Sequence, residues 1–275
     1  MRRPPYLAAC VIALTLAAAT HAGADPAKGP KPQARKASQH AADKSPDTGG
    51  AKPWCAPEVH ELEDHVCYAE GEVPADGRRT LVVYMHGAYA TTPGFAWLQQ
   101  RAMALHAKRL GFTVLLPTSP RTENAYVWPT SEAAQKEQEA SLLTGIKHAR
   151  EKLEKRVGHA FDEVFVVGFS SGAYYASTVA VRGAMDVDGY VVLAGGSSWA
   201  RTHAEGSKRA PVFVGVSAAD GQTRDHSRAY AGTLATLRWP SKVEERNAGH
   251  EVDWTLLTHG IGWLRAQKKR AGEPR

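Results

Sequence analysis

One serine in the sequence has surroundings that favour nucleophilic chemistry. The segment 168–172 (GFSSG) directly follows the apolar run VFVV and leads into residues that are compatible with a helix. Where a G-x-S-x-G pattern joins a strand to a helix, the serine occupies a strained turn, and the flanking glycines let the backbone pass without a side-chain clash. Gly168 and Gly172 flank Ser170 symmetrically, so Ser170 is the predicted nucleophile. An ordinary strand-to-helix turn is the alternative interpretation.

A serine hydroxyl is a poor nucleophile at neutral pH, so this chemistry also requires a base and an acid that orients the base. His250 lies after the last strand-like segment, and the glycine before it permits a tight turn. Asp220 follows the apolar run 212–216, whereas the rival acid Asp225 lies deeper in an expected helix. In their positions these two residues resemble the histidine loop and the acid loop of the α/β-hydrolase superfamily, and this resemblance implies that His250 accepts the proton of Ser170 and that Asp220 orients the imidazole ring. A loop histidine with no role in catalysis is the alternative for His250.

The order of serine, acid and histidine along the chain resembles that of the α/β-hydrolase superfamily, and the resemblance covers about residues 80–267. An oxyanion hole needs two backbone donors that are in place before negative charge develops. The amide of Ser171, directly after the predicted nucleophile, is the expected first donor. The resemblance to esterases with a His-Gly-x sequence after the first strong strand makes the amide of Ala88 the expected second donor. A plain glycine turn is the alternative there.

Two aromatic residues stand directly beside these motifs. Tyr89 follows Ala88, and Phe169 precedes Ser170. Their positions make both residues candidates for lining a substrate pocket. Large amphipathic side chains near a site more often pack in the core or at its rim, so packing is the alternative.

The elements that must position these residues alternate along the chain from residue 80 onward. Apolar runs typical of strands covered on both faces lie at 81–85, 112–116, 164–167, 190–194 and 212–216. Helix-compatible segments lie at 95–110, 131–156, 171–183, 223–237 and 251–267. This alternation predicts an α/β-hydrolase fold, with a mostly parallel central sheet and helices on both faces. Residues 242–246 fit a polar edge strand, residues 58–74 are ambiguous, and 195–211 is too short for a large cap domain.

The N-terminus has the features of an export signal. Two arginines, a short apolar run and small residues before Asp25 predict a signal peptide at 1–24, with an uncleaved membrane anchor as the alternative. Residues 25–53 are rich in Pro, Gly, Lys and Ser, which predicts a disordered basic linker before a hydrolase domain at 54–270. Outside the signal, Cys55 and Cys67 are the remaining cysteines, and an even number in an exported chain favours a disulfide over two free thiols.

The net charge of +6 does not indicate nucleic-acid binding. The excess of basic residues lies in the two ends, and the region between them is slightly acidic. Such ends could associate weakly with an anionic cell envelope. The sequence contains no His-Glu-x-x-His, no Cys-x-x-Cys and no glycine-rich phosphate loop, so we expect neither a metal nor a cofactor.

Serine at the centre of the motif narrows the expected reaction to acyl transfer. The chain looks most like capless carboxylesterases, lysophospholipases and secreted polyester or feruloyl esterases. We therefore expect a secreted or periplasmic enzyme that hydrolyses a small or polymeric carboxylic ester through an acyl-enzyme. A peptidase or amidase of the same fold is one alternative, and a non-catalytic envelope-binding module is the other. The acyl and alcohol groups of the substrate do not follow from the fold.

Overall fold

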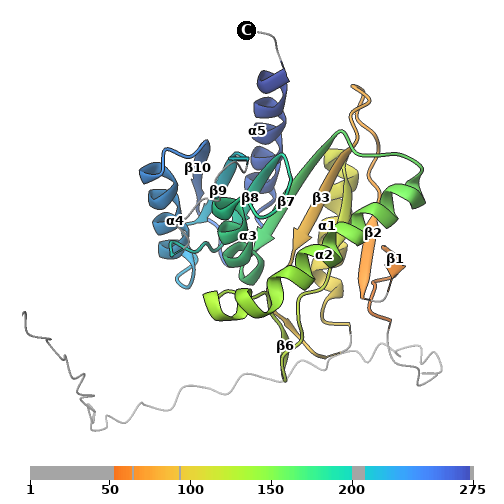
Figure 1. The fold of residues 1–275 in the computed structure, drawn as a ribbon, viewed down its shortest axis with the longest axis horizontal. Helices are drawn as coiled ribbons and strands as arrows, with labels where there is room; N and C mark the ends of the chain where they lie inside the picture. The colour runs from red at the N-terminus through yellow and green to blue at the C-terminus, as the bar shows by residue number, and fades with distance from the viewer. Residues whose placement is uncertain (1–52, 64, 93, 200–207, 273–275) are drawn as a thin grey trace, which may run out of the picture. The chain divides into compact units, whose positions relative to one another are not determined.

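The computed structural model describes residues 53–272, except for residues 64, 93 and 200–207. The expected signal peptide at 1–24 and, apart from Pro53, the expected linker at 25–53 lie outside the described residues. Between residues 53 and 272 the described chain forms an eight-stranded sheet, a separate two-stranded sheet and five helices (Figure 1).

The central sheet is mostly parallel. Its order is β1-β2-β5-β3-β7-β8-β9-β10, and all neighbouring pairs from β5 to β10 are parallel. β1 is antiparallel to β2, which is antiparallel to β5, and the small second sheet pairs β4 with β6. The strands are β1 (His60–Glu63), β2 (Val66–Ala69), β3 (Thr80–Met85), β4 (Tyr89–Ala90), β5 (Thr113–Leu116), β6 (Ala125–Tyr126), β7 (Glu163–Phe169), β8 (Gly189–Leu193), β9 (Val212–Ser217) and β10 (Ser241–Arg246).

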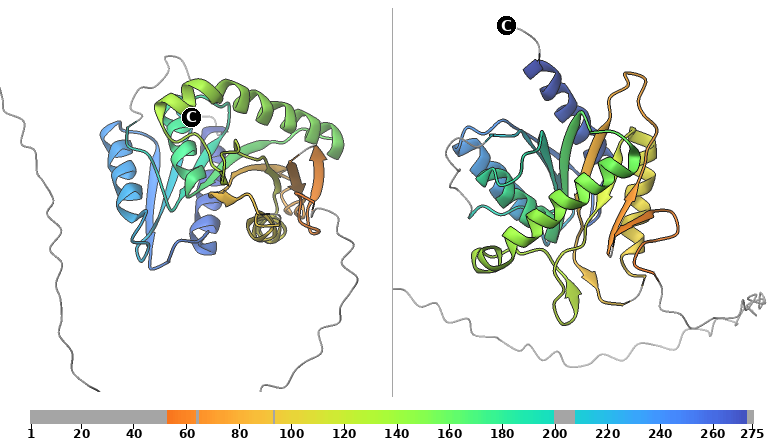
Figure 2. Two further views of the ribbon diagram at one scale, coloured as in Figure 1. Left: turned by 90° about the horizontal axis from the view of Figure 1, so that it is seen from below. Right: turned by 45° about the vertical axis from the view of Figure 1, so that its right-hand side comes forward.

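Helices cover both faces of the central sheet (Figure 2). Because successive side chains of a strand point to opposite faces, β3 contributes to two apolar cores. Leu81 and Val83 pack in the core that α2, α3 and α4 cover, whereas Val82 and Tyr84 pack in the core that α1 and α5 cover. The helices are α1 (Trp97–Leu110), α2 (Glu132–Val157), α3 (Ser171–Arg182), α4 (Arg224–Thr236) and α5 (Trp254–Gly272). The predicted α/β fold class is confirmed.

The predicted strands and helices are all present, with shifted ends. The largest shift is in α5, which begins at Trp254 and continues to Gly272 rather than running from 251 to 267. The polar segment at 242–246 is edge strand β10, as expected. Residues 58–74, which were ambiguous, contain β1 and β2. Among the described residues between β8 and β9 there is no helix.

Capping residues explain where the longest helix, α2, begins and ends. The side chain of Ser131 accepts a hydrogen bond from the amide of Ala134 and so caps the first turn. At the other end Gly158 adopts a φ of 77°, and its amide donates to the carbonyl of Glu154. A left-handed glycine after the last turn is the common way for a helix to stop.

Cys55 and Cys67 form a disulfide, as the cysteine count predicted. Their Cα atoms are 5.8 Å apart, and the bridge joins the segment before β1 to strand β2. In the chain-entropy model, closing a loop of this size contributes about 3 kcal/mol to stability. The bridge therefore anchors the start of the described chain to β2, the second strand of the central sheet.

The described helices show no membrane-spanning candidate, because none combines the length and the apolar character that crossing a bilayer requires.

Candidate active site

Ser170 occupies a strained turn between β7 and α3. Its backbone has φ 51° and ψ −117°, a conformation that costs energy for a residue with a Cβ atom. The turn is held at both sides, because the Ser170 amide donates to the carbonyl of Leu193 at 3.1 Å. Its carbonyl accepts from the amides of Ala173 and Tyr174 at 2.9 and 3.1 Å. The surrounding structure thus holds the serine in the turn that G-x-S-x-G predicts.

The two flanking glycines are required by close backbone contacts. A Cβ atom on Gly168 would lie 2.5 Å from the carbonyl oxygen of Gly172. One on Gly172 would lie only 1.9 Å from the carbonyl oxygen of Met85. The Gly172 amide also donates to the carbonyl of His86 at 3.0 Å. The start of α3 therefore packs directly on the end of β3, which brings the serine turn next to the loop after β3.

Replacing Gly172 with alanine is expected to lower the free energy of unfolding by about 3 kcal/mol, because the new methyl group would collide with backbone that cannot rotate away. Gly262→Ala is the matched control, since this exposed helical glycine has no atom within 4 Å of its Cβ position. Alanine there should stabilise α5 by up to about 1 kcal/mol. Urea unfolding followed by circular dichroism measures both changes. Equal stabilities for the two variants would contradict the packing described above.

Ser170, His250 and Asp220 form a continuous chain of hydrogen bonds. Nε2 of His250 lies 3.0 Å from Oγ of Ser170, and Nδ1 lies 2.7 Å from Oδ2 of Asp220. Exposure changes along the chain: the His250 side chain is 36% exposed, whereas that of Asp220 is 1% exposed. The structure therefore brings the three predicted residues together in a serine–base–acid geometry, with the acid buried behind the base.

Asp220 is held as a carboxylate by the hydrogen bonds around it. Burial alone would raise its pKa, but hydrogen bonds from the side chains of Thr223 and His250 and from the amide of Gln222 lower the pKa to about 2. Oδ1 accepts from the amides of Gln222 and Thr223, and Oδ2 accepts from the Thr223 hydroxyl and from His250. A charged acceptor facing Nδ1 keeps the proton of His250 there and leaves Nε2 free to accept one.

Adjacent strands fix the spacing of Asp220 and His250. The loops after β9 and β10 are joined by backbone bonds from Ala218 to Arg246 at 2.7 Å and from Ala219 to Ala248 at 3.1 Å. The rival acid Asp225 is 74% exposed on α4 and pairs with arginines of the same helix. It does not contact His250 in the described hydrogen bonds.

His86 links the loop after β3 to its surroundings. Its Nε2 accepts from the amide of Ser119 at 3.1 Å, so the ring proton is on Nδ1, which donates to the carbonyl of Gly87 at 2.5 Å. Burial lowers the pKa of His86 to about 4, against the opposing effect of the bond to Gly87. The ring is therefore neutral at pH 7 and holds residues 86–88, named here the His86–Ala88 loop, against the segment that follows β5.

The predicted oxyanion donors lie on the His86–Ala88 loop and at the start of α3, which meet at the end of β3. Ala88 is exposed in the His86–Ala88 loop, whereas the Gly87 amide is already bonded to Oε1 of Gln99 at 3.0 Å. Ser171 is the first residue of α3, where amides have no acceptor within the helix. Its side chain is buried and accepts from the amide of Trp128 at 3.1 Å, so its hydroxyl is occupied by a structural contact.

Of the two candidate pocket residues, only Phe169 contacts the hydrogen-bonded chain of Ser170, His250 and Asp220. Its ring centre lies 5.1 Å from that of His250. A Cβ atom on Gly87 would lie 3.0 Å from Cδ1 of Phe169. Tyr89 is 3% exposed, and its ring stacks on His86 with centres 3.9 Å apart. Tyr89 therefore supports the His86–Ala88 loop from behind, the packing role that was the alternative.

A second polar pair lies beside Ser170 and was not predicted from the sequence. Tyr174, one turn into α3, is hydrogen-bonded through its hydroxyl to Nδ1 of His226 on α4. Partial burial raises the pKa of Tyr174, and the nearby Asp220 carboxylate adds to the effect. Nothing in the local sequence signals this contact, because the two residues are 52 positions apart. The spacing of four residues between Ser170 and Tyr174 indicates only that Tyr174 lies near the serine, and it says nothing of His226.

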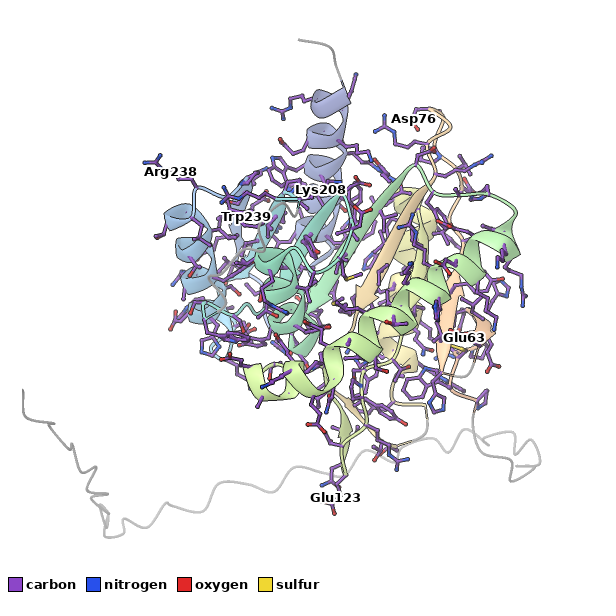
Figure 3. The ribbon with its side chains drawn as sticks, in the orientation of Figure 1. Glu63, Asp76, Glu123, Lys208, Arg238 and Trp239 are labelled. Atoms are coloured by element: carbon purple, nitrogen blue, oxygen red, sulfur yellow. A yellow bond between two sulfur atoms is a disulfide. The ribbon has the colours of Figure 1, made fainter. Side chains whose placement is uncertain are left out.

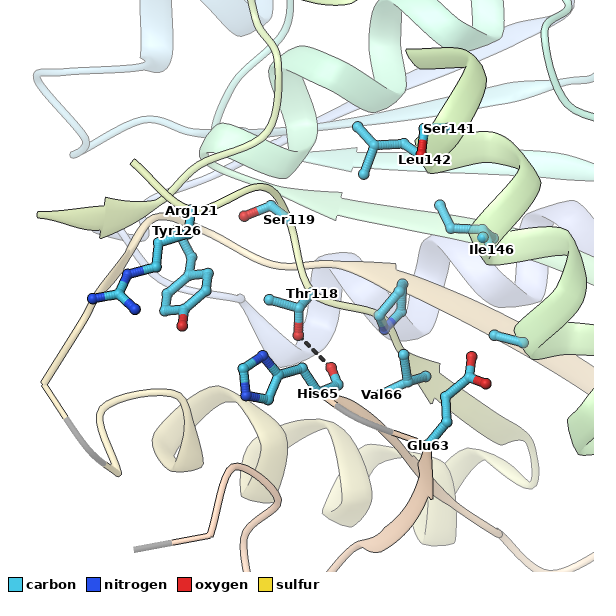
Figure 4. A pocket seen from close by; sticks show the side chains of 13 residues that line it. Glu63, His65, Val66, Thr118, Ser119, Arg121, Tyr126, Ser141, Leu142 and Ile146 are labelled. Atoms are coloured by element: carbon cyan, nitrogen blue, oxygen red, sulfur yellow. Dashed lines mark hydrogen bonds between the residues drawn. The ribbon is translucent and has the colours of Figure 1, made fainter. Parts of the chain in front are cut away.

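A separate cavity of about 410 Å³ lies between α2 and the segment after β5 (Figure 4). Its walls include His65, Thr118, Ser119, Tyr126 and residues of α2, and none of Ser170, Asp220 and His250. The Thr118 hydroxyl donates to the carbonyl of His65 across this region. Two residues of the cavity wall contact the His86–Ala88 loop or the residue next to it: the Ser119 amide donates to His86, and Tyr126 pairs with Tyr89. In the part of the chain that the structure describes, no three His, Cys, Asp or Glu side chains are grouped to hold a metal ion.

Comparisons with known proteins agree with this fold. The structure of YahD with malic acid superposes with a TM-score of 0.51 at 14% identity, covering 73% of this chain and 98% of that one. The crystal structure of the Bacillus cereus carboxylesterase gives a TM-score of 0.52 at 14% identity, covering 73% and 93%. No curated protein sequence shows a significant match.

The family comparison is more specific than the structural ones. The model of the family described as Esterase PHB depolymerase matches residues 68–228, which is more than half of the chain. The match begins in β2 and includes the Ser170 turn and Asp220, and it ends in α4 before His250. The chain belongs to the Esterase PHB depolymerase family and is a carboxylic ester hydrolase with the α/β-hydrolase fold.

Proposed function

We propose that this esterase acts through an acyl-enzyme on Ser170, with His250 as the base and Asp220 as the acid that orients it. The observation that carries the proposal is the unbroken hydrogen-bonded chain from Asp220 through His250 to the Ser170 hydroxyl. The strained turn of Ser170 supports it, because such strain persists where a functional group must be held in a defined position.

The protons move along this chain in two steps. Nε2 of His250 takes the proton of Ser170 as Oγ attacks the ester carbonyl, and Asp220 stabilises the imidazolium that forms. His250 then gives that proton to the departing alcohol, which leaves the acyl group on Ser170. Water attacks the acyl-enzyme by the same route and releases the carboxylic acid. Asp220 remains ionised throughout, in keeping with its lowered pKa of about 2.

The negative charge of the tetrahedral intermediate would be bound by the amides of Ala88 and Ser171. The backbone is held in place around both amides, by the His86 bonds at the His86–Ala88 loop and by the Gly172 contact with Met85 at the start of α3. Donors that are already oriented need no rearrangement when the charge appears, which is why they stabilise the transition state effectively.

We also propose that the enzyme is secreted or periplasmic. The Cys55–Cys67 disulfide supports this location, because disulfides persist mainly in oxidising compartments. The signal peptide at 1–24 and the weak attraction of the basic ends to an anionic envelope belong to the same proposal. Retention on cell envelope that falls as salt is added would test the latter.

A fluorophosphonate probe tests the proposed nucleophile directly. We expect one covalent adduct per chain, on the tryptic peptide that contains Ser170, together with complete loss of ester turnover. Ser131→Ala is the control, since it removes only the cap of α2, at a cost of about 1 kcal/mol, and should be labelled fully. A folded protein that turns over an ester but is labelled at another residue would refute the assignment of Ser170.

A further inference from the structure

The first described residues of the chain are hydrogen-bonded to helix α1. The carbonyl of Pro53 accepts from the indole of Trp97 at 3.1 Å, and that of Trp54 accepts from Gln100 at 3.3 Å. The amide of Ala56 donates to Oε1 of the same buried Gln100 at 2.7 Å. The segment is therefore bound to α1 along its length rather than lying loosely on the surface.

The disulfide holds the same segment from its other side. Cys55 directly follows Trp54, and its partner Cys67 lies within β2 and is fully buried. Nε2 of Gln100 also lies 3.6 Å from Sγ of Cys67. The backbone of Trp54 is thus fixed between α1 and the sheet, which determines where its ring can lie.

The ring of Trp54 lies between His65, in the turn from β1 to β2, and Tyr126 of β6. Its centre lies 4.8 Å from that of His65 and 4.8 Å from that of Tyr126, in an edge-on contact with the latter. It also lies 6.4 Å from the ring of Tyr89, the partner of Tyr126 in the β4–β6 pair. Figure 4 shows His65 and Tyr126 as neighbours at one end of the cavity described above. Trp54 therefore packs beneath the short β4–β6 sheet.

Tyr89 connects Trp54 to the His86–Ala88 loop. It follows Ala88 directly and stacks on His86 with an angle of 9° between the rings. Trp54, His86, Tyr89 and their neighbours line a partly open pocket of about 10 Å³, which has room for at most one water molecule. His86 and Tyr89 are buried and Trp54 is half-buried against them, so a shift of the Trp54 ring changes the packing of its two neighbours.

We infer that Trp54, fixed by the Cys55–Cys67 disulfide, is a positioning residue that holds the Ala88 amide in the oxyanion hole. The inference rests on the proposed function. Removing the indole would open a hole beneath Tyr89 and let the His86–Ala88 loop move. A displacement of about 1 Å at a catalytic group costs roughly 100-fold in rate. Gln99 and His86 would still hold Gly87, so the loop should loosen without unfolding.

The test compares Trp54→Ala with Trp54→Phe. We expect the alanine variant to lower kcat for a p-nitrophenyl ester by about 10- to 100-fold, with KM changed by less than about 2-fold. Its affinity for a boronic acid, which forms a tetrahedral anion on the serine, should fall by the same factor. Phenylalanine keeps an aromatic ring in the stack and should restore kcat to within about 3-fold of the wild type.

Two further variants separate positioning from general destabilisation. Trp239→Phe disturbs a tryptophan that is buried, whereas Trp54 is half-buried. The indole of Trp239 donates to the carbonyl of Ala210, and Trp239 lies far from Glu123, which is near the β4–β6 tip (Figure 3). It should lower the melting temperature and leave kcat unchanged. The pair Cys55→Ser with Cys67→Ser frees the backbone of Trp54 and should lower kcat in the same direction as Trp54→Ala.

Each outcome bears on a different claim. If the wild type hydrolyses the ester but Trp54→Ala loses no more kcat than Trp239→Phe, the positioning role is refuted and the proposed function stands. The positioning role is likewise refuted, and the proposed function stands, if Trp54→Ala changes KM and the melting temperature but not kcat. A folded wild type without any ester turnover refutes the proposed function, and the inference falls with it.

Discussion

Ser170→Ala is expected to lower kcat/KM for a soluble ester by about 10⁵-fold or more, leaving only the rate that oriented binding and the oxyanion donors provide. The alanine cannot form the acyl-enzyme, and His250 then has no hydroxyl to deprotonate at 3.0 Å. A p-nitrophenyl ester series followed at 405 nm measures the loss, with the residual rate compared with that of the buffer alone.

The variant should fold like the wild type, which makes the kinetic loss interpretable. The Ser170 hydroxyl has one described hydrogen bond, to the half-exposed His250, and alanine at φ 51° carries the same backbone strain as serine. An unchanged melting temperature and near-ultraviolet spectrum would establish this. If the variant kept more than about one hundredth of the activity, Ser170 could not be the nucleophile.

Asp220→Asn is expected to lower kcat by about 10⁴-fold while the protein remains folded. Oδ1 of an asparagine can still accept from the amides of Gln222 and Thr223, which places its NH₂ group toward His250. That group would donate to Nδ1 and force the ring proton onto Nε2, where it blocks the transfer from Ser170. The effect is therefore on the tautomer of His250 rather than on its position.

Asp225→Asn is the matched control for this loss of charge. Asp225 lies five residues further on and is 74% exposed, so its replacement should leave kcat within about 2-fold of the wild type. Measuring kcat for both variants between pH 5 and 9 separates the tautomer effect from a change in net charge. Equal activity of Asp220→Asn and the wild type would remove Asp220 from the proposed mechanism.

The parts of the fold with long apolar runs could be predicted from the sequence. β3, β7, β8 and β9 are buried on both faces, so nearly every residue in them is apolar, and the pattern does not depend on register. The Ser170 turn could also be predicted from the sequence, because close backbone contacts allow only glycine at positions 168 and 172. The proximity of Asp220 and His250 could be predicted as well, because they lie in the loops after neighbouring parallel strands, β9 and β10.

Short elements that depend on distant partners could not be predicted. β1 reads His-Glu-Leu-Glu and buries one side chain, and β4 and β6 have two residues each and exist because Tyr89 pairs with Tyr126. The bond between Tyr174 and His226 depends on how α3 and α4 pack, which local spacing does not encode. Tyr89 is buried against His86 and lies near Trp54, a residue that precedes the range 80–267 over which the sequence resembles α/β-hydrolases.

The two outer strands of the central sheet have a consequence for how the protein behaves at high concentration. β10 presents Lys242, Glu244, Glu245 and Arg246 along one border, and β1 presents Glu61 and Glu63 along the other. A second molecule that added a strand to this sheet would place its own charged edge residues beside these, and the charged side chains of both molecules would lose bound water. In the described chain, β1 and β10 each have a backbone edge without a neighbouring strand, and these charges oppose the pairing of such edges between molecules. We therefore expect this esterase not to form fibres at high concentration.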